Sequence, residues 1–84
     1  MPFYVYILQS EKDGSYYVGS AQDLEERIQR HNQGRSLYTK GKGPWELVYE
    51  EEYPDRSLAV RRENEIKSRK KKSYIESLVR TSRP

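Results

Sequence analysis

The chain has 84 residues, a formal net charge of +3 and no cysteine. This length fits one small domain, and we expect residues 1–84 to form it. The lack of cysteine argues against a secreted scaffold held by disulfides and predicts a cytoplasmic protein. We find no basic leader with a cleavage site and no apolar run long enough to span a bilayer, so we expect neither a signal peptide nor a membrane partner.

Charge is distributed unevenly along the chain. Residues 1–55 contain six Lys or Arg and ten Asp or Glu, whereas residues 56–84 contain ten and three. The first segment is therefore net −4 and the second net +7, which together give +3. A basic C-terminal third predicts a positive face of the kind that binds nucleic acid. The alternative is a solvated helix that is merely rich in Lys and Arg.

The N-terminal residues predict a β-hairpin. Residues 3–10, FYVYILQS, are β-branched and aromatic and predict a strand. Asp13 and Gly14 form a strong hairpin-turn signal, and residues 15–20 predict the returning strand. Gly19, near the end of this strand, indicates a bend or the close approach of another backbone.

A helix and a long loop follow the hairpin. Ser20 and Asp23 have the spacing of a capping box, which predicts a helix over about 21–33 that begins after Ser20. Gly34 is a suitable residue to end this helix. Residues 33–44 contain three glycines and a proline without apolar periodicity, and they predict a basic loop.

The second half predicts one strand and two helices. Residues 45–53 read as a strand whose three consecutive glutamates suit the edge of a sheet. Pro54 and Asp55 interrupt the chain, a helix is expected to begin near Ser57, and 73–80 predict a last helix. The order is β-β-α-β-α-α, which predicts an α+β fold: a small three-stranded, mostly antiparallel sheet flanked by helices.

Several polar side chains lie on or beside surfaces that this fold needs for burial. The first helix has two of them beside its apolar stripe, the second helix has one within its stripe, and the hairpin strands have two phenols that can approach each other. These residues are Tyr6, Tyr17, Arg27, His31 and Glu63.

Each of these residues also has an ordinary structural interpretation. His31 can be a hydrogen-bonded buried side chain, and Arg27 can lie along its own helix with its charge in water. Glu63 can pair with Lys67 at i+4. The phenols can simply belong to a core rich in tyrosine, because the chain has eight of them.

Taken together, these groups suit phosphoryl chemistry. A carboxylate can bind a divalent cation, and a guanidinium can bind phosphate through two hydrogen bonds. A phenol with a pKa near 10 is about one part in a thousand ionised at neutral pH. We therefore expect Arg27, or a metal ion held by Glu63, to lower the pKa of Tyr6 or Tyr17, so that one phenol activates water.

The arrangement resembles the GIY-YIG nuclease family over nearly the whole chain. The residues that carry the resemblance are YVY at 4–6, YVG ten residues later, an arginine in the first helix, and Glu63 followed by Ile66 and Lys67. The resemblance implies that Tyr6 and Tyr17 are the two motif tyrosines and that Arg27 is the catalytic arginine. His31 then falls at a polar position that many members fill with histidine.

The same resemblance implies an activity and a cofactor. Glu63 matches the single metal-binding glutamate, and the family uses one Mg²⁺ or Mn²⁺ to hydrolyse a phosphodiester bond. Members include DNA-repair, homing, restriction and junction-resolving endonucleases, so the expected substrate is nucleic acid, with DNA favoured over RNA. Tyr4 and Val5 stand where the first family element has Gly and Ile.

Binding is expected to come from basic residues of the loop, the second helix and the segment after it, and to weaken steeply with salt. These are Lys40, Lys42, Arg61, Lys67, Arg69, Lys70, Lys71 and Lys72. Nothing in the sequence suggests base readout, so we expect weak sequence preference. One alternative is a nucleic-acid-binding module with little or no turnover, or a subunit that a protein partner completes or directs to its target. A second alternative is a structural protein that interacts through the acidic strand at 46–53.

Overall fold

The computed structural model describes residues 1–35, 38–69 and 71–82. Within these ranges the elements follow the order β-β-α-β-α-α, which confirms the predicted α+β fold. The elements are β1 (Phe3–Ser10), β2 (Tyr16–Ala21), α1 (Leu24–Asn32), β3 (Trp45–Tyr53), α2 (Arg56–Ser68) and α3 (Lys72–Ser82). None of the helices in the described ranges is long and apolar enough to cross a membrane.

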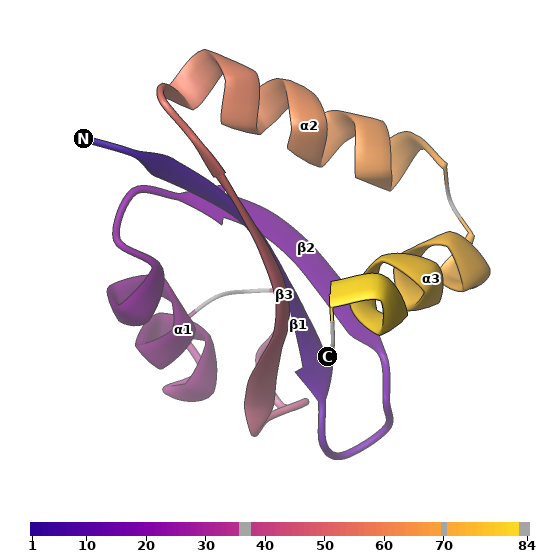
Figure 1. Cartoon of the computed structure of the whole chain (residues 1–84). Coiled ribbons are helices and arrows are strands. Elements are labelled where there is room, and N and C mark those ends of the chain that lie inside the picture. The colour runs from indigo at the N-terminus through magenta and orange to yellow at the C-terminus, as the bar shows by residue number, and fades with distance from the viewer. Residues whose placement is uncertain (36–37, 70, 83–84) are drawn as a thin grey trace.

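The sheet is antiparallel, and β1 is its central strand. The strand order is β2-β1-β3, so β2 and β3 are both edges (Figure 1). Gly14 has φ of +77° and turns the chain between β1 and β2, as the Asp-Gly signal predicts. In this register Tyr6 of β1 lies opposite Gly19 of β2 and Glu50 of β3.

Both faces of the sheet are covered. Alternate residues of β1 face opposite sides, so Val5 and Ile7 pack with α2 and α3, whereas Tyr6 and Leu8 pack with α1. Figure 1 shows α1 on one side of the sheet and α2 with α3 on the other. Side chains from α1 and from α2 are thus separated by the sheet and can approach each other only around one of its edges.

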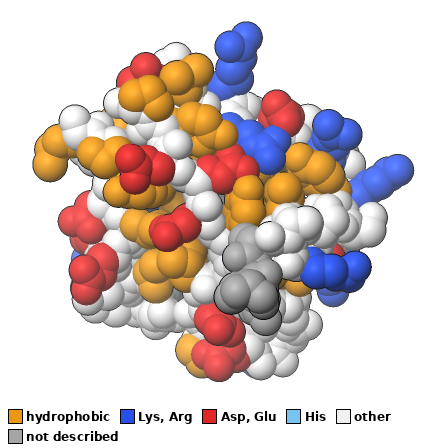
Figure 2. All heavy atoms as spheres, viewed as in Figure 1, with side chains coloured by type: hydrophobic (Ala, Val, Ile, Leu, Met, Phe, Trp, Pro, Cys, Tyr) orange, Lys and Arg blue, Asp and Glu red, His pale blue; other side chains and the backbone are white. Residues whose placement is uncertain are grey.

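Basic side chains gather on the side formed by the end of α2 and by α3. Figure 2 shows Lys and Arg mostly on that side of the visible face and Asp and Glu mostly on the other side. The exposed residues concerned are Arg61, Lys67, Arg69, Lys71 and Lys72. The expected positive face is therefore present in this part of the chain.

The start of α1 differs from the prediction. Ser20 does not cap the helix, because β2 continues to Ala21 and the Ser20 side chain points toward α2. The cap is Asp23, whose carboxylate accepts a hydrogen bond from the backbone N–H of Glu26 at 3.0 Å. The helix is consequently shorter at its start than predicted, while Gly34 follows its end with a positive φ, as expected.

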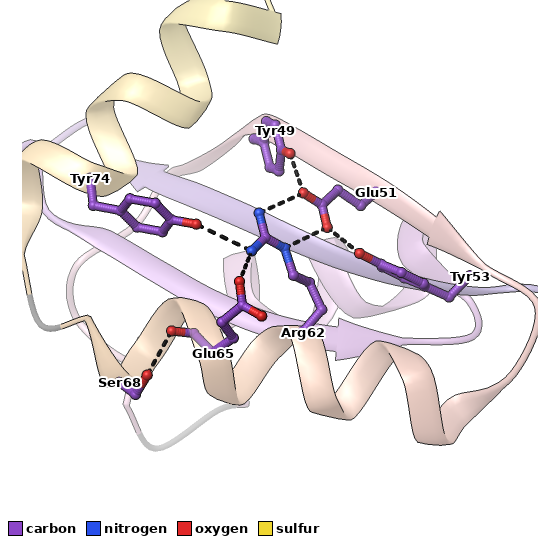
Figure 3. A network of polar contacts seen from close by, with 7 residues as sticks. All are labelled: Tyr49, Glu51, Tyr53, Arg62, Glu65, Ser68 and Tyr74. Atoms are coloured by element: carbon purple, nitrogen blue, oxygen red, sulfur yellow. Dashed lines mark hydrogen bonds and ion pairs between the residues drawn. The ribbon is translucent and has the colours of Figure 1, made fainter.

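A polar network fixes α2 and α3 against β3 (Figure 3). Arg62 of α2 donates to both carboxylate oxygens of Glu51 on β3, at 2.9 and 3.1 Å. The hydroxyls of Tyr49 and Tyr53 donate to the same carboxylate, and Arg62 also donates to the Tyr74 hydroxyl of α3 at 3.2 Å. One of the three glutamates expected to protect an edge therefore has an internal structural role.

The network changes the protonation of its members. Burial alone would raise the pKa of the Glu51 carboxyl, but hydrogen bonds from Arg62 and the two tyrosines outweigh it and lower that pKa. Burial and the neighbouring carboxylate raise the pKa of Tyr49 and that of Tyr53 to about 12 each. Glu51 is therefore ionised, and both phenols are protonated, at neutral pH.

Replacing Glu51 should destabilise the fold in a pH-dependent way. We expect Glu51→Gln to lower the free energy of unfolding at pH 7 by about 1–3 kcal/mol, because a hydrogen-bonded buried charge is lost. Since the folded-state pKa of Glu51 is lowered, its contribution is present above its ordinary pKa of 4.5 and disappears as the pH falls below that value. Urea unfolding at pH 7 and pH 3.5 measures both effects.

Glu50→Gln is the matched control, because Glu50 is an exposed neighbour on the same strand. It should change the free energy of unfolding by less than about 0.5 kcal/mol. Equal effects of the two substitutions would contradict the assigned role of the network.

Candidate active site

The Tyr6 side chain lies directly over Gly19. A Cβ atom placed on Gly19 would be 2.5 Å from the Tyr6 hydroxyl oxygen and 2.7 Å from its Cζ, both much closer than side chains tolerate. The missing side chain of Gly19 therefore leaves the space through which Tyr6 reaches across β2. The close approach at Gly19 is therefore made by a side chain, and not by the backbone that the sequence predicts.

His31 lies at the end of this tyrosine. Its Nε2 is 3.0 Å from the Tyr6 hydroxyl, and its Nδ1 is 2.8 Å from Oγ1 of Thr39. Thr39 is 1% exposed, and its carbonyl accepts a hydrogen bond from the indole N–H of Trp45. The loop after α1 thus contributes a buried residue that fixes the imidazole ring from the other side.

Burial determines the protonation of this pair. Burial, assisted by the nearby Tyr17, raises the pKa of Tyr6 well above its usual value despite the opposing effect of the Arg27 guanidinium. Arg27 thus has the expected lowering effect on the Tyr6 pKa, but desolvation outweighs it and the net shift is upward. Burial also lowers the pKa of His31, helped by Arg27 and Arg30. At neutral pH Tyr6 is a phenol and His31 is uncharged.

Tyr17 and Glu63 meet at the edge of β2 through Lys67. The Tyr17 ring lies 6.3 Å from the Tyr6 ring and 4.7 Å from the His31 ring, measured between centroids. The Lys67 ammonium is 5.9 Å from the Tyr17 centroid and 2.6 Å from Oε2 of Glu63. The Glu63–Lys67 pair considered as the structural alternative is thus present, and it lies against a motif tyrosine.

Glu63 is also held by the sheet. The Ser20 hydroxyl donates to Oε1 of Glu63 at 2.5 Å, so both carboxylate oxygens have partners from this chain. The Glu63 side chain is 16% exposed. The carboxylate is therefore kept in place and close to the surface.

Arg27 approaches the site from α1. Its charge influences the pKa values of both Tyr6 and His31, which places its guanidinium close to both side chains. Its Nε is buried, and no acceptor for it is found among the described residues. A buried donor without a partner is unusual in folded proteins and often marks a functional group.

The structure therefore brings the five candidate residues of the predicted site together, at two depths. Tyr6 and His31 are 0% and 2% exposed and lie beneath the surface. Tyr17, Arg27 and Glu63 are only partly buried and form the accessible layer above them. A bound ligand would meet this second group first.

The basic residues fall into separate groups. Lys67, Lys71 and Lys72 line one groove beside β2. Arg69 stacks its guanidinium on Tyr74, with 4.8 Å between Cζ and the ring centroid. The remaining predicted residues do not line that groove: Lys40 and Lys42 are exposed on the loop, Arg61 is exposed on α2, and Lys70 lies outside the described residues.

Two partners of the site escape the sequence analysis. Ser20 was assigned to a helix cap, although its alternation with Gly19 in the strand already places its side chain on the face toward α2. Thr39 lies in a loop without periodicity, where no sequence signal distinguishes a buried threonine from an exposed one. Tertiary packing alone gives Thr39 its role.

Comparison with known proteins agrees with this geometry. Residues 2–75 match the family model described as the GIY-YIG catalytic domain, so the chain belongs to the GIY-YIG family. It is 44% identical over 81 residues to a UPF0213 protein of Halalkalibacterium halodurans, with 93% of this chain and 85% of the relative covered. It is 50% identical over 72 residues to a UPF0213 protein of Staphylococcus saprophyticus, with 82% and 87% covered.

A solved structure supports the fold. The solution NMR structure of a UPF0213 protein from Bacillus halodurans matches with a TM-score of 0.57 at 42% sequence identity. The match covers 93% of this chain and 85% of the other. The names of these relatives carry no statement of what they bind or cleave.

Filling the space at Gly19 should distort the site. We expect Gly19→Ala to lower the free energy of unfolding by about 1–3 kcal/mol, because the added methyl group collides with the buried Tyr6 ring. Denaturant unfolding measures this change. Gly43→Ala is the control, since its Cβ would have its nearest neighbour at 3.7 Å; a loss as large as that of Gly19→Ala would refute the steric explanation.

The single histidine offers a test of burial. Because the folded-state pKa of His31 lies below its ordinary value of 6.5, the unfolded chain binds the proton more readily. The stability that His31 contributes is thus complete above pH 6.5 and is lost as the pH falls. We expect the free energy of unfolding to decrease from pH 7.5 to 5.5 in the wild type and to decrease less in His31→Gln. Parallel curves would contradict a buried, neutral imidazole.

Proposed function

We propose that the protein is an endonuclease that hydrolyses phosphodiester bonds in nucleic acid, with DNA as the main substrate. The observation that carries this proposal is that Tyr17 lies against the His31 ring while Lys67 joins Tyr17 to Glu63 at the edge of β2, with Arg27 close enough to affect both Tyr6 and His31. The family match supports the same chemistry, because it is to a catalytic domain.

Arg27 is the group best suited to bind the reacting phosphate. Its planar guanidinium can donate two parallel hydrogen bonds to phosphate oxygens. Its Nε has no acceptor among the described residues, which leaves this donor for a ligand. As negative charge develops on the phosphorus oxygens, a fixed cation in a partly buried site stabilises it more than water does.

Tyr17 is the motif tyrosine that substrate can reach. Tyr6 is completely buried and stays protonated, so its role is to position His31 and the Tyr17 ring from below. The Tyr17 hydroxyl then orients the attacking water or holds a phosphate oxygen. His31, being neutral, can accept a proton that is passed through the hydroxyl groups around it.

The chemistry of Glu63 fits a divalent cation. Its carboxylate attracts a cation within the chain, because the Lys67 ammonium lies 2.6 Å from it. No group of three or more His, Cys, Asp or Glu side chains that could hold a metal ion lies among the described residues, and Glu63 is the acidic side chain of the candidate site. Mg²⁺ accepts one carboxylate when water and substrate phosphate complete its coordination. When bound, Mg²⁺ or Mn²⁺ would act as a Lewis acid on the phosphate.

Nuclease activity gives a direct test. We expect the purified chain to nick plasmid or cut single-stranded DNA with Mg²⁺ or Mn²⁺ and to be inactive in EDTA. Glu63→Gln and Arg27→Lys should each lower the rate about 100-fold or more, because each removes a charge or a geometry that stabilises the transition state. A gel-based cleavage assay at several enzyme concentrations measures this.

The matched control is Glu25→Gln, an exposed position on α1 that should leave the rate unchanged. Thermal unfolding of every variant shows whether a loss of rate reflects a loss of folding. If Glu63→Gln and Arg27→Lys cut as fast as the wild type, the activity comes from a contaminant. Binding without cleavage, in all metals tested, would instead support the alternative of a nucleic-acid-binding module or a subunit completed by a partner.

A further inference from the structure

A groove of about 630 Å³ runs beside β2 and is separate from the polar pair beneath the site. Its walls come from β2, from the end of α2, from the start of α3 and from Tyr38 of the loop. These segments meet at one edge of the sheet, as Figure 1 shows for β2, α2 and α3. A volume of this size is typical of sites for small organic groups.

The lining combines flat aromatic surfaces with positive charge. Tyr16, Tyr17 and Tyr38 line the groove, together with Lys67, Lys71 and Lys72, and none of the described lining residues is acidic. Tyr38 is 80% exposed, an unusual position for a large aromatic side chain. The Lys72 ammonium lies 5.9 Å from the Tyr16 centroid, so aromatic faces and cations are adjacent.

The groove is continuous with the candidate active site. Tyr17 and Lys67 belong to both, because Tyr17 contacts the His31 ring and Lys67 binds Glu63. A chain of nucleotides with one phosphate at Tyr17 would therefore have a neighbouring nucleotide in the groove.

We infer that this groove binds a nucleobase next to the reacting phosphodiester, by stacking against Tyr16 and Tyr38, while Lys71 and Lys72 bind the flanking phosphates. This inference rests on the proposed function insofar as it takes nucleic acid as the ligand. A nucleobase has the required combination of a flat face and an attached negative charge, and stacking on aromatic side chains tolerates any base. The groove thus supplies affinity without sequence readout.

An abasic oligonucleotide separates base binding from phosphate binding. Fluorescence anisotropy in EDTA, which prevents metal-dependent cleavage, would compare a labelled DNA pentamer with the same strand lacking its central base, and a matching RNA pentamer. The wild type should bind the complete strand about fivefold or more tightly than the abasic strand. DNA and RNA should both show this preference if the base face is the recognised feature.

Variants assign the effect to the groove. Tyr38→Ala and Tyr16→Leu should each weaken binding of the complete strand about fivefold and leave the abasic strand within twofold. Tyr38→Ala is the safer variant for folding, because the side chain is mostly exposed. Lys72→Gln should weaken both strands and reduce the slope of log Kd against log salt by nearly one unit. Tyr4→Leu, outside the groove, is the control and should bind as the wild type does.

The outcomes distinguish this inference from the proposed function. If the complete and abasic strands bind equally, or if no strand binds, the groove is not a base site, even where the protein cuts DNA with metal. If the base preference is present and is lost in Tyr38→Ala, the groove is a base site, even where no cleavage is detected. A preference that survives both tyrosine variants also overturns the assignment.

Discussion

The arrangement of the site depends on the contact between Tyr6 and the backbone of Gly19. Any larger residue at position 19 would occupy the space taken by the Tyr6 hydroxyl. Because this space is open, a tyrosine of the central strand extends over the edge strand and meets His31 at 3.0 Å. The imidazole then supports the Tyr17 ring, which faces outward. The absence of a side chain at Gly19 therefore allows Tyr6, in the core of the sheet, to support the accessible layer of the site through His31.

The position of the site follows from the sandwich of helices around the sheet. Arg27 and His31 come from α1 on one face, whereas Glu63 and Lys67 come from α2 on the other. The sheet keeps these groups apart everywhere except around an edge strand. β2 provides that edge: Tyr17 points toward the α1 side, Ser20 points toward the α2 side, and Ser20 binds Glu63 directly. Edge strands expose unpaired backbone groups that favour aggregation, but here the edge strand β2 is where side chains from α1 and from α2 come together.

The features that depend on periodicity can be predicted from the sequence. The features that depend on tertiary packing, such as the partner of Ser20 and the pKa of Tyr6, cannot. Alternation in β1 correctly separates Val5 and Ile7 from Tyr6, and the turn and the breaks give the order of elements. Ser20 was misassigned because its capping-box spacing competes with continuation of the strand, and the Glu63 carboxylate favours the strand. The sequence predicts the lowering effect of Arg27 on a phenol pKa because charges are visible in it, whereas the depth of burial that raises the Tyr6 pKa is not.

The two layers of the site have different chemical capacities. Tyr6 and His31 are buried and uncharged at neutral pH, so they act on a substrate only from below, Tyr6 by positioning and His31 through the hydroxyl groups around it. Charge is concentrated in the outer layer, where the Glu63 carboxylate already binds the Lys67 ammonium. In the proposed function, a metal ion at Glu63 would compete with that ammonium, and Lys67 would then be able to bind the phosphates of a strand in the adjoining groove. Metal binding and nucleic-acid binding would then favour each other, because each removes a competitor of the other.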